Sequence, residues 1–171
     1  PATHPPLRGE AKLRAALSTF EVAVQGRICL DLGAAAGGFT RVLLEAGAER
    51  VYAVDVGHGQ LLGSLRQEPR VVNLEATNVS ALDTSVIPDL IEVVTIDVTY
   101  LALAAAVAQL DRINFAPDAD LVGLVKPVFE LRTGTAPTNP DSVLPATDRP
   151  VQGIEATGRR VIEAMQPQSL A

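Results

Sequence analysis

The run RICLDLGAAAGGFTRVLLEAGAERVYAVDV, residues 27–56, decides the fold class. Its first six residues are mostly apolar, as in a strand that is buried on both faces of a parallel sheet. Three glycines follow, at positions 33, 37 and 38, and then a helix predicted over 39–46 and a second strand predicted over 50–56. A strand, a glycine-rich turn, a helix and a strand together predict one βαβ unit.

The same alternation continues along most of the chain. Apolar spacing predicts helices over 10–22, 60–67 and 101–115, and strands over 71–76, 91–98 and 120–126. Strands that alternate with helices predict a doubly wound α/β fold, with a mostly parallel, Rossmann-like sheet and helices on both of its faces.

The two ends of the chain depart from this alternation. Three prolines in residues 1–7 predict an extended arm, and the polar, proline-rich segment 133–150 predicts a long exposed loop. A last helix is predicted over 151–165, although Gly153 and Gly158 weaken it, and no strand is predicted after it. We expect a single domain over residues 1–171, because this length suits one core.

The composition excludes several classes of protein. The chain is 47% hydrophobic and 20% charged, which excludes a disordered tail and a coiled coil. No apolar stretch reaches the roughly 20 residues that cross a bilayer and no secretory signal is recognisable, so we expect a cytoplasmic location without membrane contact. Cys29 is the single cysteine, and His4 and His58 lie far apart, so neither a disulfide nor a structural zinc site is expected.

The charge balance bears on nucleic-acid binding. Fourteen basic residues against 20 acidic ones give a net charge of −6, which is the wrong sign for holding nucleic acid by bulk electrostatics. Any RNA contact is therefore expected to be local, or to need help from another subunit or the ribosome. Lys12 and Lys126 are the two lysines, against 12 arginines.

The glycine-rich turn is the first candidate for a binding site, because ligands of a doubly wound sheet lie beyond the carboxyl ends of its strands. Glycines at 33, 37 and 38 can turn tightly and bring bare backbone against a ligand. Their spacing, G-x-x-x-G-G, differs from the dinucleotide pattern G-x-G-x-x-G, which favours a cofactor without phosphates over a nicotinamide dehydrogenase. Glycines needed only for packing would give the same turn.

Four further polar residues stand at predicted strand ends. Asp55 ends the second strand, where an acidic residue binds the ribose hydroxyls of an adenosine cofactor or caps the next turn. Asn78 follows the third strand and either meets the adenine edge or makes an Asx turn. Asp97 and Lys126 end the fourth and fifth strands, which suggests a charged pair across a catalytic cleft; a solvated strand end is the alternative for Lys126.

Together these residues resemble the methyltransferase domain of the haemolysin A family, a group of FtsJ-like, S-adenosylmethionine-dependent RNA 2′-O-methyltransferases. The segments that carry the resemblance are Arg8-Gly9, Lys12-Leu13, Ala16-Leu17, LDLGAAAGGFTRVLLEAGAERVYAVDVGHGQL (30–61), LEATNV (74–79), VTIDVTYLAL (94–103) and LVKPVFE (124–130). The resemblance implies ribosomal RNA as the substrate and S-adenosylmethionine as the cofactor. The residues it implies for binding the cofactor are Asp31, Gly33, Ala34, Gly37, Gly38, Phe39, Asp55, Val56, Asn78 and Asp97.

The resemblance also implies a Lys-Asp-Lys-Glu catalytic tetrad, of which three members match Lys12, Asp97 and Lys126. In that chemistry the ribose 2′-hydroxyl attacks a sulfonium methyl group in line, so the site positions the hydroxyl and stabilises its developing negative charge. Lysine suits this because burial or a nearby cation lowers its pKa, whereas arginine stays charged. We expect Lys126 nearest the hydroxyl, Asp97 orienting it, and Lys12 completing the charge environment or holding the RNA.

The chain departs from the family pattern at several points. The fourth catalytic residue, a Glu in a C-terminal segment, is expected to be missing, and so are the final strand pair of the sheet and an N-terminal RNA-binding domain of the S4 type. Without that strand pair the fifth strand would be an exposed edge, through which two copies could pair. Within the motifs, Leu7-Arg8-Gly9-Glu10 replaces Ser-Arg-Gly-Gly, Val128 replaces Gln, and His58 replaces Tyr.

Two alternatives to an active enzyme follow from these departures and from the family's name. The first is a truncated or diverged module that binds the cofactor without catalysis. The second is a pore-forming haemolysin, which is disfavoured because the sequence has no membrane-spanning or basic amphipathic segment.

Overall fold

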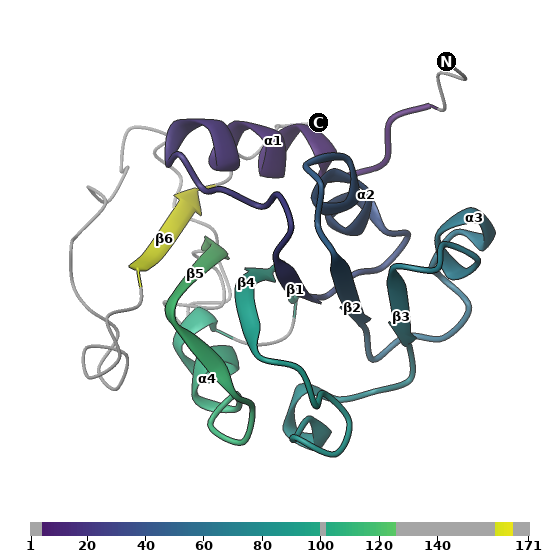
Figure 1. Ribbon diagram of the computed structural model, residues 1–171. Helices are drawn as coiled ribbons and strands as arrows, with labels where there is room; N and C mark the ends of the chain where they lie inside the picture. Colours follow the sequence, from purple (N-terminus) through teal and green to yellow (C-terminus); the bar gives the residue numbers. More distant parts are fainter. Residues whose placement is uncertain (1–4, 100–101, 126–159, 166–171) are drawn as a thin grey trace, which may run out of the picture.

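One parallel sheet organises the chain, in a computed structural model that describes residues 5–99, 102–125 and 160–165, the last of these by its backbone. Its six strands lie in the order β3-β2-β1-β4-β5-β6, and each neighbouring pair is parallel (Figure 1). The strands are β1 (Ile28–Leu32), β2 (Arg50–Val54), β3 (Val71–Leu74), β4 (Ile91–Ile96), β5 (Phe115–Val125) and β6 (Arg160–Met165). The helices are α1 (Glu10–Thr19), α2 (Gly38–Glu45), α3 (Gly63–Arg66) and α4 (Leu103–Ala108), with a 3-10 turn η1 (Val79–Ala81). The predicted doubly wound α/β fold is confirmed.

Helices cover both faces of this sheet (Figure 1). On one face α1, α2 and α3 pack in a cluster of buried side chains that includes Cys29 of β1. On the other face α4 and η1 pack in a second cluster that includes Leu30 of β1. Successive strand residues point to opposite faces, so adjacent residues of β1 belong to the two cores. Burial on both faces explains why the sequence of β1 is almost continuously apolar.

The end of β1 is the place where the strand order reverses. Leu32 pairs with Val54 of β2 on one side and with Ile96 of β4 on the other. Because all three strands are parallel, the loops that follow them emerge at the same edge of the sheet. This is the position at which a doubly wound sheet binds its ligands.

The fourth predicted helix and the fifth predicted strand have other bounds than the sequence indicated. The helix predicted over 101–115 ends at Ala108, and Phe115 already pairs with Ile91 of β4. The β4–β5 register shifts between Ile91 and Val93, which leaves an irregular stretch around Pro117. A proline lacks the N–H that a regular ladder needs, so it is accommodated at this irregularity. Sheet pairing therefore prevails over the helical spacing of the apolar residues.

The C-terminal helix predicted over 151–165 is wrong for residues 160–165, which form β6. This strand pairs in parallel with residues 120–125 of β5. Its β-branched Val161 and Ile162 favour an extended backbone. The expectation that β5 is an exposed edge is wrong for the same reason, because β6 pairs with it. The predicted loop over 133–150, the first four residues of the predicted arm, and Lys126 lie outside the described residues.

Candidate active site

A cavity of about 310 Å³ lies at the carboxyl ends of β1, β2 and β4. Its walls come from the loops after those strands and from the turn after β3. The lining residues are Gly33, Ala35, Val54, Asp55, Val56, Gly57, Gln60, Thr77, Val79, Asp97, Val98 and Thr99. Small-molecule sites typically measure roughly 300–1,000 Å³, so the cavity can hold much of a nucleoside-sized ligand. The structure thus brings together four residues proposed from the sequence, namely Gly33, Asp55, Val56 and Asp97.

Gly33 brings the loop after β1 against the loop after β4. Its φ is +86°, and a β-carbon at this position would lie 2.6 Å from the carbonyl oxygen of Asp97. The N–H groups of Gly33 and Ala34 donate to the carbonyl oxygen of Val54 at 2.9 and 3.0 Å, which joins the same loop to the end of β2. Only glycine combines this backbone conformation with such a close approach.

Asp31 lies beneath the glycine-rich turn and has no exposed surface. Its two carboxylate oxygens accept hydrogen bonds from the hydroxyls of Thr40 in α2, at 2.7 Å, and Thr95 in β4, at 2.8 Å. Burial raises the pKa of Asp31 to about 6, although the two hydroxyls favour the charged form. The carboxylate therefore ties β1, α2 and β4 together inside the protein. This arrangement points to positioning of the turn as its role, in place of the direct cofactor contact expected from the sequence.

Asp55 joins the loops after β1 and β2 and also lines the cavity. One of its oxygens accepts from the N–H of Ala35 at 2.9 Å, and the other accepts from the N–H of Gly57 at 2.7 Å. Each carboxylate oxygen has two lone pairs, so each can accept one further hydrogen bond. The neighbouring Val56 is 48% exposed and offers an apolar surface at the cavity wall.

The other cofactor residues proposed in and next to the glycine-rich turn shape the loop and do not line the cavity. Gly37, with φ +97°, is the N-cap of α2, and Gly38 lies against the backbone carbonyl of Arg8, where a β-carbon would collide with it. Ala34 and Phe39 are buried, at 6% and 7% exposure. These residues fix the start of α2 beside the N-terminal segment, so any effect they have on a ligand passes through the shape of the loop.

Asn78 makes the turn that the sequence allowed as an alternative to adenine contact. Its side-chain oxygen accepts from the N–H of Ser80 at 3.0 Å and from the hydroxyl of Ser80 at 2.9 Å, so it caps η1. The residues on either side of it, Thr77 and Val79, line the cavity. Asn78 therefore shapes the wall from outside the lining.

The structure describes two of the three proposed catalytic residues, Asp97 and Lys12. Asp97 is half-buried and lines the cavity, and its N–H donates to the carbonyl oxygen of Leu32 at 2.9 Å. Lys12 is half-buried in the first turn of α1. Lys126 directly follows β5 and lies outside the described residues, so its pairing with Asp97 stays a prediction.

The helix that carries Lys12 is fixed to α2 by an ion pair with little exposure. An oxygen of Glu10 lies 2.9 Å from a guanidinium nitrogen of Arg41, and the two side chains are 10% and 15% exposed. The same oxygen accepts from the N–H of Leu7 at 2.9 Å. That N–H, together with Arg41, lowers the pKa of Glu10. Glu10, which stands where the family motif has glycine, thereby sets the position of α1 relative to the glycine-rich turn.

Several lining residues were missed by the sequence analysis. They are Ala35, Val54, Gly57, Gln60, Thr77, Val79, Val98 and Thr99. A usable signal was present, because each of them lies at the carboxyl end of a strand or in the segment that follows one, and these positions form the binding edge of a parallel sheet. Small and uncharged side chains gave no chemical reason to single them out.

Neither a metal centre nor a membrane-spanning helix is present in residues 5–99, 102–125 and 160–165. Within these ranges no three His, Cys, Asp or Glu side chains gather in a way that could hold a metal ion. No helix there is long and apolar enough to cross a bilayer.

Residues 7–152 match the model of a protein family described as FtsJ-like methyltransferase. The chain belongs to this FtsJ-like methyltransferase family. The alternative of a nicotinamide dehydrogenase, which the glycine spacing already disfavours, is thereby wrong.

Individual proteins of known name are also similar to this FtsJ-like methyltransferase chain. The 16S/23S rRNA (cytidine-2′-O)-methyltransferase TlyA of Mycobacterium tuberculosis is 44% identical over 157 residues, which are 91% of this chain and 57% of TlyA. Hemolysin A of Brachyspira hyodysenteriae is 38% identical over 132 residues, 74% of this chain and 53% of that protein. A solved structure from Lactococcus lactis that carries the hemolysin name has a TM-score of 0.72 and 33% identity, covering 79% of this chain and 67% of that chain. The resemblance to the haemolysin A family is confirmed, and the chain spans little more than half the length of the first two relatives.

Proposed function

We propose that this chain transfers a methyl group from S-adenosylmethionine to a ribose 2′-hydroxyl of ribosomal RNA. The observation that carries the proposal is the cavity bounded by Gly33, Asp55 and Asp97 at the point where the strand order reverses. Ribosomal RNA is proposed as the substrate because TlyA, a relative at 44% identity, is named for that activity. With a net charge of −6, the chain would hold RNA with help from another subunit or the ribosome.

The residues of the cavity fit the nucleoside part of S-adenosylmethionine. Asp55 keeps one acceptor position on each oxygen, which matches the two hydroxyls of a ribose. Val56 offers apolar surface to a base, and the missing side chain of Gly33 leaves space where the two loops meet. The carboxylate of Asp97 suits a sulfonium cation, because opposite charges attract strongly in a partly buried site.

The catalytic work is assigned to the three charged residues that match the family's tetrad. S-adenosylmethionine, when bound, supplies an electron-poor methyl group on a sulfonium. Lys126, as a neutral amine, is proposed to hold the 2′-hydroxyl and accept its proton while the methyl carbon bonds to the oxygen and its bond to sulfur breaks, which leaves a neutral thioether. Asp97 is proposed to orient Lys126, and Lys12 to add positive charge that stabilises the developing alkoxide or holds a phosphate.

Binding and transfer can be tested separately on this chain. Isothermal titration with S-adenosylmethionine measures binding, and transfer of a labelled methyl group to 30S and 50S ribosomal subunits measures catalysis. Asp97→Asn should lower the transfer rate about 100-fold or more, because Asp97 is proposed to position the acid–base group Lys126, and a positioned acid–base group contributes roughly 10²–10⁴-fold. Asp111→Asn is the matched control, since Asp111 is an exposed residue in the turn after α4 and does not line the cavity.

The outcomes separate the enzyme from the binding module. Methyl transfer by the wild type that is lost in Asp97→Asn and kept in Asp111→Asn supports the proposal. Binding of S-adenosylmethionine without transfer to either subunit would leave a cofactor-binding module of the same fold. Absence of binding would overturn the assignment of the cavity.

A further inference from the structure

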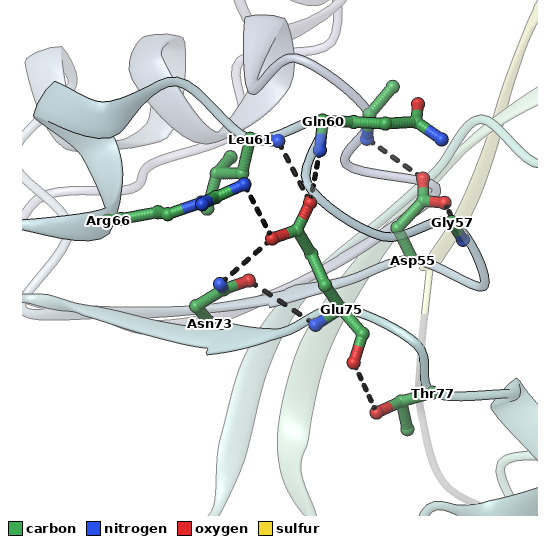
Figure 2. Close-up of polar contacts among 9 residues, drawn as sticks. Asp55, Gly57, Gln60, Leu61, Arg66, Asn73, Glu75 and Thr77 are labelled. Carbon is green, nitrogen blue, oxygen red and sulfur yellow. Dashed lines mark hydrogen bonds and ion pairs between the residues drawn. The ribbon is translucent and has the colours of Figure 1, made fainter.

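Glu75, which follows β3, is a nearly buried carboxylate outside the cavity lining, with a side-chain exposure of 7%. One of its oxygens accepts from the backbone N–H groups of Gln60 and Leu61, at 2.6 and 2.9 Å. The other lies 3.1 Å from both the amide nitrogen of Asn73 and the guanidinium of Arg66. Figure 2 shows the carboxylate at the centre of these four donors.

The two backbone N–H groups belong to the segment 57–61, which we call the 57–61 loop. This loop contributes Gly57 and Gln60 to the cavity wall, and Gly57 also donates to Asp55. The carbonyl oxygen of Gly57 accepts from the N–H of Ala76 at 2.8 Å. The turn after β3 therefore holds the loop at its start through Ala76 and at its end through Glu75. Glu75 supplies the anchor at the end next to Gln60, and Figure 2 shows the side chain of Gln60 extending toward Asp55.

A carboxylate is the group that this position requires. All four partners are donors, and a carboxylate presents only acceptors. The donors, led by the N–H of Leu61, lower the pKa of Glu75 to about 2, so the anchor stays charged at any pH used for an assay. In the nearly isosteric Gln, the NH₂ group would face two donors and would leave them without an acceptor.

We propose that Glu75 is a positioning residue for the cofactor, which holds the 57–61 loop as the cavity wall on the side of Asp55. This rests on the proposed function only in naming the ligand as S-adenosylmethionine. Loss of the anchor should weaken binding and leave the reacting end of the site, at Gly33 and Asp97, in place. A residue that merely supported the fold would affect stability and turnover without this separation.

The main test is Glu75→Gln, measured by titration with S-adenosylmethionine and by methyl-transfer kinetics. We expect the Kd and KM for S-adenosylmethionine to rise about 10-fold, with kcat changed by less than about twofold. Glu68→Gln is the matched control: Glu68 also pairs with an arginine, Arg70, at 2.9 Å, but does not line the cavity or contact the 57–61 loop. Its Kd should stay within about twofold of wild type.

A double variant tests the geometry by rescue. In Asn73→Asp with Glu75→Gln, the new carboxylate at 73 can accept from the NH₂ group at 75, and the remaining oxygen at 75 still faces the loop. We expect the Kd to return to within about threefold of wild type. The added carboxylate also restores the negative charge that Glu75→Gln removes, so the double variant matches the wild type in net charge.

Hydrogen exchange of the amides of Gln60 and Leu61 gives a readout that needs no ligand. Both amides should exchange faster in Glu75→Gln, while amides of β1 keep their protection. Equal Kd values for wild type and Glu75→Gln, or unchanged exchange at both amides, would overturn the inference and leave the proposed function standing. If both amides exchange faster in Glu75→Gln but the wild type does not bind S-adenosylmethionine, Glu75 does hold the 57–61 loop and the ligand has been wrongly named.

Discussion

Replacing Gly33 with alanine tests whether the site depends on the close approach of two loops. The added β-carbon would lie 2.6 Å from the carbonyl oxygen of Asp97 and 2.9 Å from its carbonyl carbon, and both atoms are backbone. Alanine at φ +86° also adopts the left-handed conformation, which costs roughly 1–2 kcal/mol. Forcing an extra carbon into a packed site costs about 1–3 kcal/mol more. We expect the free energy of unfolding to fall by about 2–5 kcal/mol.

Two other glycines separate the steric effect from the backbone effect. Gly26 has φ +72° and nothing within 4 Å of a β-carbon, so Gly26→Ala should show the backbone cost alone, about 1–2 kcal/mol. Gly63, the first residue of α3, has neither a left-handed φ nor a close neighbour, so Gly63→Ala should be neutral or stabilise by roughly 0.5–1 kcal/mol. The difference in unfolding free energy between Gly33→Ala and Gly26→Ala measures the cost of the contact with Asp97.

Urea denaturation of the three variants gives the stabilities, and titration with S-adenosylmethionine gives the functional effect. Displacement of the Asp97 backbone should raise the Kd of Gly33→Ala about 10–100-fold, because small displacements at a binding site have large effects. The two control variants should bind as wild type does. If Gly33→Ala lost no more stability than Gly26→Ala and bound normally, the loops would not need the close approach described here.

Two further predictions concern charged groups. Burial raises the pKa of Asp31 from 3.8 to about 6, so the folded protein binds a proton at Asp31 more tightly than the unfolded chain does. Protonation of Asp31 therefore stabilises the fold fully below about pH 3.8, and this stabilisation is lost as the pH rises through about 6. Relative to Asp31→Asn, the wild type should therefore lose on the order of 3 kcal/mol of unfolding free energy between pH 4 and pH 7, as urea denaturation can measure; a pH-independent difference would contradict the burial effect. A double-mutant cycle on Glu10 and Arg41 should give a coupling in the upper part of the roughly 0.5–3 kcal/mol range for contacting residues. The Arg14–Glu45 pair, with both side chains 48% exposed, should give only about 0.2–1 kcal/mol, and equal couplings would refute the role assigned to burial.

The sheet could be predicted because its signals are local in the sequence. A doubly buried strand such as β1 is apolar almost throughout, and glycines mark where it ends. The second strand was predicted over 50–56 but ends at Val54, because Asp55 and Val56 leave the ladder to form the cavity wall. The two residues that the prediction wrongly placed in the strand, Asp55 and Val56, are thus residues of the cavity wall.

The errors in the fold came from pairing between distant segments. Phe115 fits a helical spacing, yet it pairs with Ile91, and no neighbouring residue signals that contact. Residues 160–165 likewise become a strand through β5, whose backbone groups they satisfy. Such choices depend on which strand edge is open after the rest of the sheet has formed, and a local pattern does not record this.

The site was predictable to the extent that its chemistry stands at strand ends. Asp55 and Asp97 are charged residues directly after strands, and both line the cavity. The position of Asp31 depended on Thr40 and Thr95, which come from a helix and a strand elsewhere in the chain. Glu75 lies in the matching segment LEATNV (74–79), but the sequence gives it no role, because the loop it holds is bound through backbone N–H groups that have no sequence signature.

The strand order has a consequence for how the protein is made. Asp31 and Thr95 are 64 residues apart in the chain, so one edge of β1 stays unpaired during synthesis until β4 has emerged from the ribosome. Until then the nascent chain contains the Asp55 side of the cavity but not the Asp97 side, and the backbone N–H and C=O groups on one edge of its central strand stay unpaired. The cavity is therefore complete only after β4 has paired, so a ligand that bridges the Asp55 and Asp97 sides can stabilise the fold only late in synthesis.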